Sequence, residues 1–305
     1  MNGAMLAMSA YLGLLILWGS VVPGAALSAF LSESQYVRGR SKLLDKFGQQ
    51  SAALSVKSLA LLLLLLCPWV LYSLLYGRVP HWLLEAVSGQ GVLGLAVLPL
   101  LSGLIGVVLY SGAWQALHYR KGLHRLLGAV SLLGILGGIY AVINAQLGQD
   151  GQLASQGLAG WRAVWFPAGH PVWPLWSAAV LNAVASAGAA KMIYLILRRE
   201  KDDFGRDYYR FALARAAKWA PVLLALPPLG AGWIALSSPA AFSTRILILL
   251  AAAAAVAIAA AALCLPVIRS RHPLRLKANA AGVLLLTWVL DVILVLFVSP
   301  GAWPA

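Results

Sequence analysis

The sequence predicts an all-α fold, a polytopic transmembrane bundle of about eight helices with both termini on the outer side of the membrane. Composition is the first observation: 61% of the 305 residues are apolar, 10% are charged, and the mean hydropathy is +0.84. Soluble domains carry about 25% charged residues, so most of this surface is expected to face lipid. The second observation is the recurrence of apolar runs of about 20 residues, the length that crosses a hydrocarbon core. The third is an alternating distribution of basic residues.

The apolar runs define the expected spans in order along the chain. They cover residues 5–30, 52–77, 91–117, 126–147, 171–197, 219–236, 245–268 and 278–299. Small residues in the fourth, fifth and seventh runs suit close helix approach. The first run has no basic segment before it and no clear cleavage site, so we expect a retained helix rather than a signal peptide. No polar connection is long enough for a separate domain, so residues 1–305 are predicted to form a single membrane domain.

Basic residues are concentrated in every second connection. Segments 38–46, 120–125, 198–218 and 269–277 hold 18 of the 23 lysines and arginines. Cytoplasmic connections of membrane proteins carry an excess of these residues. The pattern therefore places these four connections in the cytoplasm and both termini outside. It also explains the net charge of +14 without a nucleic-acid partner.

Polar residues inside the spans are candidates for chemistry, because buried ionisable groups are costly in lipid. Asp291 lies about 12 Å below the outer surface, counted from the end of its span. It either serves proton transfer or quinol binding, or makes a structural contact to a tryptophan, asparagine or backbone donor. Asn144 and Asn182 are expected to bond neighbouring helices. Lys57 and Lys191 lie near inner span ends, where we expect their ammonium groups to reach toward water.

Motifs for metal binding and hydrolysis are missing from the sequence. Cys67 and Cys264 lie in predicted spans at opposite membrane depths, so neither a disulfide nor a metal cluster is expected. Phosphate-cradling loops and hydrolase motifs are absent, which argues against hydrolases and nucleotide-driven pumps. None of the five histidines lies mid-span, where a haem ligand would face the bundle. His170, near Trp173 on the outer side, is the best single haem-ligand candidate.

Two stretches resemble subunit I of the cytochrome bd-type quinol oxidases. Residues 104–148 contain Trp114, a basic turn, the sequence HRLLG beginning at His124, and Asn144, and they are similar to that family's third and fourth helices. Residues 165–221 contain His170, a small-residue helix and a charged turn, and they resemble its fifth helix and the turn that follows. Residues 38–61 resemble the turn before the second helix. Together these regions cover about half of the chain, and the family's outside N-terminus agrees with the charge pattern.

The departures from that family concern its cofactor ligands. The family has a haem-ligating histidine in its first helix, but residues 5–30 contain none. Its third helix carries acidic residues, whereas the region around Gly103 has none. Its methionine haem ligand follows a long quinol-binding loop, whereas residues 237–243 form a short connection and the next span lacks methionine and histidine. We therefore expect this shortened relative to lack the oxygen-reducing centre and the usual quinol loop.

These points lead to the hypothesis of a bd-like membrane subunit of a respiratory electron-transfer complex, located in a bacterial-type inner (plasma) membrane. We expect no haem on this chain, with haem b less favoured than quinone as a ligand. An outer-side quinone site is expected at His170, Trp173 and Asp291. The expected partners are the lipid bilayer and membrane or periplasmic redox subunits such as cytochromes and iron–sulfur proteins. A small-solute transporter or channel and a purely structural assembly subunit remain as alternatives, and whether the chain is catalytic stays open.

Overall fold

The computed structural model describes residues 3–39, 41–75, 91–149, 170, 172–202, 204–237 and 243–298, and none of these residues lies in a β-strand. The regular structure consists of α-helices and two short 3₁₀ helices. In chain order these are α1 (Gly3–Gly39), α2 (Lys42–Leu75), α4 (Gly91–Gly112), α5 (Lys121–Gln149), α6 (Val172–Arg198), α7 (Arg206–Ala217), η3 (Ala220–Ala225), α8 (Leu226–Ser237), α9 (Thr244–Arg269), η5 (Pro273–Arg275) and α10 (Lys277–Val298).

Seven described segments are long and apolar enough to cross a membrane. Six of them belong to α1, α2, α5, α6, α9 and α10, and the seventh, Arg206–Leu236, combines α7, η3 and α8. The apolar part of α4, Val97–Gly112, is shorter. The all-helical fold of a multi-pass membrane bundle is thus confirmed, while the number of about eight spans stays a prediction.

At the ends that carry charge, several helices extend beyond the predicted membrane spans, and the span boundaries themselves stay predictions. The first helix continues to Gly39 instead of ending near residue 30, and α2 begins at Lys42 instead of residue 52. The apolar segment formed by α7, η3 and α8 begins at Arg206, inside the part of the chain that the sequence predicts as a basic connection. The reason is amphipathicity: α7 carries arginines on one side, while its other side buries Tyr208, Tyr209 and Leu213. The count of basic residues detected the polar face of α7 but not its apolar face.

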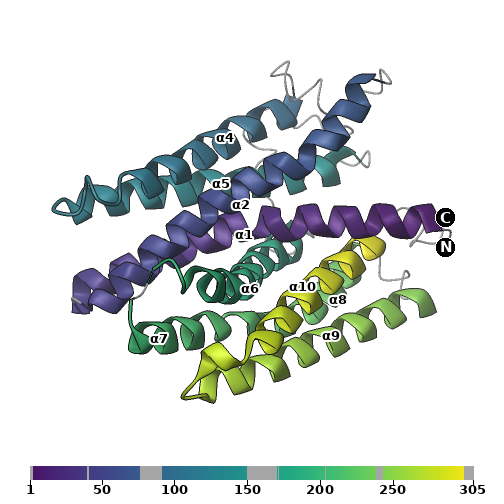
Figure 1. Cartoon of the computed structure of the whole chain (residues 1–305). Helices are drawn as coiled ribbons and strands as arrows, with labels where there is room; N and C mark the ends of the chain where they lie inside the picture. Colours follow the sequence, from purple (N-terminus) through teal and green to yellow (C-terminus); the bar gives the residue numbers. More distant parts are fainter. Residues whose placement is uncertain are drawn as a thin grey trace.

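The helices run roughly side by side, with α1 in the middle of the bundle (Figure 1). It packs against α2, α6, α10 and α5, and a separate hairpin of α4 and α5 lies beside it. The contact between α1 and α6 depends on Gly24, where an added methyl carbon would clash with the carbonyl oxygen of Ala183. Small residues let the two backbones approach this closely, as expected for helices packed in a membrane.

The four basic connections meet at one end of the bundle, which we call the basic end. Lys121 at the start of α5 lies 2.9 Å from Asp45 at the start of α2. Lys46 lies 4.1 Å above the ring of Phe204, just before α7. The N-terminal end of α1 and the C-terminal end of α10 lie together at the other end (Figure 1). This arrangement is compatible with the alternating charge pattern, and the side of the membrane that each end faces stays a prediction.

Candidate functional sites

The first candidate site joins three helices around Asp291 of α10. The side chain of Asp291 is fully buried, and its Oδ1 accepts a hydrogen bond from Nδ2 of Asn182 on α6 at 2.8 Å. The same amide nitrogen lies 3.1 Å from Oγ of Ser20 on α1. Two interpretations from the sequence are therefore confirmed: Asp291 contacts an asparagine, and Asn182 bonds neighbouring helices.

This polar contact is incomplete. Oδ2 of Asp291 and Oδ1 of Asn182 are both buried, and neither has a hydrogen-bond partner among the described residues. A buried acceptor without a donor costs about 1–3 kcal/mol. In an apolar bundle that cost is not relieved by bulk water, so the two oxygens form a place where a hydroxyl donor would be stabilised.

The other two residues of the expected quinone site lie farther out along α6. His170 precedes this helix, and its Nδ1 accepts a hydrogen bond from the backbone N–H of Val172 at 3.2 Å. Burial lowers the pKa of His170 from its ordinary value, which favours the neutral ring. Trp173 packs its ring near Tyr140, with ring centroids 5.5 Å apart.

Helix geometry separates Trp173 from the Asp291 contact. Trp173 and Asn182 are nine residues apart on α6, which corresponds to about 13 Å along the axis and about half a turn around it. Trp173 therefore faces the α5 side, and Asn182 faces α1 and α10. A ligand that touches Asp291 at one point would have to extend outward to reach Trp173. The sharing of one site by all three residues stays a prediction.

The second candidate site is centred on Glu33, which sequence reasoning missed. Glu33 of α1 and His124 of α5 are both fully buried. His124 Nδ1 lies 2.7 Å from one carboxylate oxygen of Glu33, and the hydroxyl of Tyr110 donates to the other oxygen at 2.8 Å. The second ring nitrogen of His124 lies 2.9 Å from the carbonyl oxygen of Tyr110. Both ring nitrogens of His124 thus face oxygen atoms, one of the Glu33 carboxylate and one of the Tyr110 backbone.

A lysine connects this buried pair to the surface of the basic end. Lys121 Nζ lies 3.6 Å from Glu33 and 2.9 Å from Asp45, and its side chain is 13% exposed. Its ammonium also lies 4.8 Å above the ring of Trp114. The arrangement is a charged network that begins inside the bundle and ends at its edge. It joins three packed helices through buried polar contacts and so stabilises their packing.

The signal that could have found Glu33 is the helical period of α1. Ala25, Ala29 and Glu33 are four residues apart and all three are buried, so the glutamate continues the packed face of the helix. The predicted first span ended at residue 30, which assigned Glu33 to a polar connection. The buried partner His124 was likewise assigned to a turn.

Lys191 also differs from its prediction. Its side chain is 2% exposed and does not reach toward water. Nζ donates to the carbonyl oxygen of Phe47 at 3.0 Å and to the hydroxyl of Ser51. The ammonium is also 3.2 Å from the centroid of the Phe47 ring. These groups of α2 satisfy the ammonium inside the bundle, whereas Lys57 is exposed as expected and bonds Tyr194 at 3.3 Å.

Within the described part of the chain, no three His, Cys, Asp or Glu side chains gather in a way that could hold a metal ion. Comparison with known proteins gives no further assignment, because no family model, no curated protein and no solved structure matches the chain. The functional argument therefore depends on the geometry of the buried polar groups and on the resemblance described above.

Proposed function

We propose that this chain is a membrane subunit of a respiratory electron-transfer complex, and that it contacts quinol through Asp291 and Asn182. The observation that carries the proposal is the pair of buried oxygens, Asp291 Oδ2 and Asn182 Oδ1, that lack a donor. A quinol headgroup supplies hydroxyl donors, and the bundle supplies an apolar surrounding for its tail. The resemblance to subunit I of the bd-type quinol oxidases supports the same ligand class.

The chain's own role in this proposal is to bind the headgroup and take up a proton. Oxidation of a quinol releases two electrons and two protons. Asp291 Oδ2 would receive one of these protons, the other would leave to water on the outer side, and Asn182 would hold Oδ1 in position. The electrons would pass to redox cofactors of partner subunits, such as cytochromes or iron–sulfur proteins. His170 and Trp173 would border the entrance from the outer side.

A shallow apolar groove beside α10 offers a surface to a hydrophobic ligand. It lies between α8, α9 and α10, has a volume of only about 20 Å³, and is lined entirely by apolar side chains and glycine. On α10 its wall includes Leu290, Leu294 and Phe297, so it borders the helix at the level of Asp291. An isoprenoid tail fits such a surface better than a polar solute does.

Quinol-dependent turnover of the intact complex tests this proposal. We expect Asp291→Asn to lower the rate of cofactor reduction by quinol about 100-fold, the usual effect of losing a positioned proton acceptor. The matched control is Asp207→Asn, which removes an exposed aspartate of α7 and should leave the rate unchanged. Turnover that is unaffected by Asp291→Asn, in a complex of normal yield, would remove this residue from the mechanism.

The assignment of cofactors to subunits needs a separate measurement. A reduced-minus-oxidised optical spectrum of the complex, followed by separation of its subunits, shows which polypeptide carries each band. We expect a colourless chain with coloured partners. Haem b retained on this chain would overturn that expectation and would make His170 the first ligand to replace.

A transporter remains the second candidate because of the other buried charges. Glu33, His124 and Lys191 lie inside the bundle, where ionisable groups often mark ion or solute pathways. Flux of a solute or of protons into liposomes that contain only this chain, without any redox partner, would favour this function. A purely structural subunit would show neither flux nor quinone binding, and Asp291→Asn would then change only the yield of the complex.

A further inference from the structure

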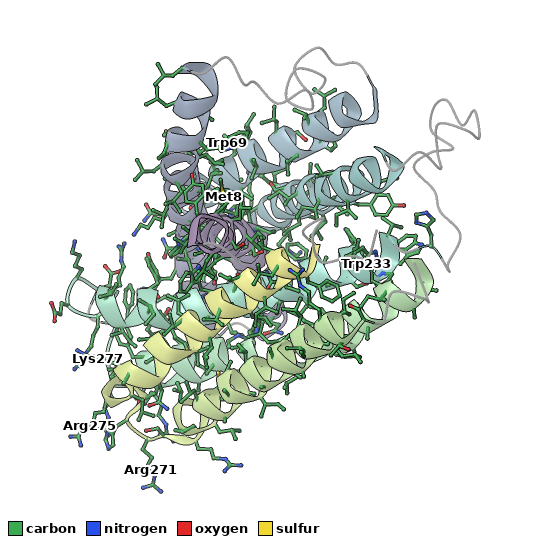
Figure 2. The ribbon with its side chains drawn as sticks, turned by 90° about the vertical axis from the view of Figure 1, so that its right-hand side faces the viewer. Met8, Trp69, Trp233, Arg271, Arg275 and Lys277 are labelled. Atoms are coloured by element: carbon green, nitrogen blue, oxygen red, sulfur yellow. The ribbon has the colours of Figure 1, made fainter. Side chains whose placement is uncertain are left out.

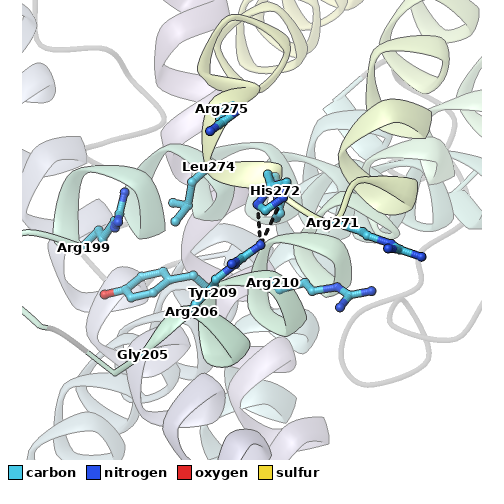
Figure 3. A pocket seen from close by; sticks show the side chains of 10 residues that line it. Arg199, Gly205, Arg206, Tyr209, Arg210, Arg271, His272, Leu274 and Arg275 are labelled. Carbon is cyan, nitrogen blue, oxygen red and sulfur yellow. Dashed lines mark hydrogen bonds between the residues drawn. The ribbon is translucent and has the colours of Figure 1, made fainter.

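A hollow at the basic end is lined by an unusual concentration of positive charge. It has a volume of about 900 Å³, including its open mouth, and lies between the end of α6, the start of α7 and the turn from α9 to α10. Its described lining holds five arginines and one histidine and no carboxylate; these are Arg199, Arg206, Arg210, Arg271, Arg275 and His272 (Figure 3).

No acidic side chain in the described lining of this hollow neutralises its arginines. A terminal nitrogen of Arg206 lies 2.7 Å from Nδ1 of His272 and 3.1 Å from Nε2. Arginine has only donors, so the imidazole acts as the acceptor in this contact. The positive charge of Arg206 is the main cause that lowers the pKa of His272, followed by burial and then by Arg275 and other arginines. The neighbouring charges thus disfavour a further positive charge at this position.

Two adjoining hollows extend the basic surface and provide few acidic groups. One shares Arg210 and contains Asp207, and the other shares Arg199 and contains Glu200. Counted once each, the residues lining the three hollows include nine lysines or arginines and these two carboxylates. The excess of positive charge therefore persists beyond the first hollow.

The position of the hollow in the bundle restricts the kind of anion. The α6 helix ends at Arg198, α9 ends at Arg269 and α10 begins at Lys277, so the hollow lies where membrane-spanning segments leave the hydrocarbon. Arg271, Arg275 and Lys277 project from this end of the molecule (Figure 2). The adjoining hollow that contains Arg210 also has apolar walls, formed by Phe211, Ala214 and Ile268. Arginines thus lie next to apolar helix surface at this end of the bundle.

We propose that this arginine-lined hollow binds the phosphate group of an anionic phospholipid, and that a lipid with two phosphates in its headgroup fits best because Arg210 is shared between two hollows. Guanidinium groups bind phosphate oxygens through paired hydrogen bonds. Basic pockets between transmembrane helices bind such headgroups. The acyl chains would follow the apolar surface beside Phe211 and Ile268. This site is independent of the quinol proposal, since no residue is common to both.

Retention of lipid by the full chain tests the proposal. The purified chain would be equilibrated with vesicles or mixed micelles of phosphatidylcholine containing diphosphatidylglycerol, and bound lipids counted by native mass spectrometry. The test variant is Arg206→Gln with Arg210→Gln. The matched control is Lys42→Gln with Arg120→Gln, which removes the same charge from exposed positions at the same end. We expect the test variant to bind diphosphatidylglycerol about 30-fold more weakly, and the control to change by less than about threefold.

Two outcomes would overturn the proposal. Equal losses in the two variants would show general attraction between a basic surface and anionic lipid rather than a site. Soluble tripolyphosphate that binds the detergent-solubilised chain through the same two arginines, and displaces the lipid, would assign the hollow to a soluble phosphate ligand. If the glutamine variant does not fold, Arg206→Lys with Arg210→Lys serves instead: it keeps the charge, loses the paired hydrogen bonds, and should still weaken lipid binding measurably.

Discussion

The Asp291 site and the Glu33 site differ in how completely their carboxylates are satisfied. Glu33 has donors at both oxygens, from His124 and Tyr110, and a lysine nearby. Asp291 has a donor at one oxygen only, and the acceptor oxygen of its partner Asn182 is also left without a donor. Both carboxylates are fully buried. Burial alone therefore does not distinguish the two carboxylates, whereas hydrogen-bond saturation does.

The two sites are expected to differ in role because a polar atom without a hydrogen bond has a high free energy in an apolar medium. A saturated network such as that of Glu33 lowers its own energy and fixes the packing of α1, α4 and α5. The unsatisfied oxygens of Asp291 and Asn182 raise the free energy of the empty site. A ligand that donates a hydroxyl hydrogen bond to them would lower that free energy. We expect the first site to contribute to stability and the second to function. The following predictions test this division, from the largest expected effect to the smallest.

Replacement of the saturated carboxylate should have the largest effect. Glu33→Gln removes a buried carboxylate that His124, Tyr110 and Lys121 contact, which is expected to lower the free energy of unfolding by about 3–5 kcal/mol. Thermal unfolding of the purified protein measures the loss. Glu200→Gln removes an exposed glutamate and should change little. Equal stability of the two variants would show that the Glu33 network does not stabilise the bundle.

Separation of α1 from α6 should have an intermediate effect. Gly24→Ala places a methyl group against the Ala183 carbonyl, and overpacking of this kind costs about 1–3 kcal/mol. Because α1 carries Ser20, the variant should also displace a neighbour of Asn182 and lower quinol-dependent turnover. The control is Gly137→Ala, at which an added methyl carbon meets nothing within 4 Å. A stable variant with full turnover would contradict the inferred tight contact.

Replacement of the unsatisfied carboxylate should change stability least among the buried groups. In Asp291→Asn the new amide keeps an acceptor for Asn182 and adds a donor for its free oxygen, so the free energy of unfolding should change by less than about 1 kcal/mol. Thermal unfolding of this variant beside Glu33→Gln provides the direct comparison. A loss as large as that of Glu33→Gln would assign Asp291 to structure and would remove the basis of the quinol proposal.

The sequence predicted the helical fold from composition and a donor contact for Asp291 from the cost of a buried carboxylate in lipid. It did not predict the Glu33 network, because that network joins residues 91 positions apart across helices. Lys191 shows the same limit: its distance from a helix end suggested exposure, but Phe47 and Ser51 of another helix satisfy its ammonium. Partners that decide the protonation and role of a buried group come from packing, which apolar periodicity does not specify.

The ion pair between Arg198 and Asp202 gives the smallest effect, since both side chains are partly exposed. The hydrogen bond from Arg198 is the main cause that lowers the pKa of Asp202 below its ordinary value. A carboxyl with a lowered pKa stabilises the folded state above the ordinary aspartate pKa of about 3.9. That contribution is lost as the pH falls through the lowered value.

Asp202→Asn should therefore cost about 0.3–0.5 kcal/mol at neutral pH, and thermal unfolding at several pH values should show the difference shrinking with acid. A difference that persists in acid would assign the effect to packing of the side chain, and a loss comparable to that of Glu33→Gln would show that exposure does not weaken ion pairs at this end of the bundle.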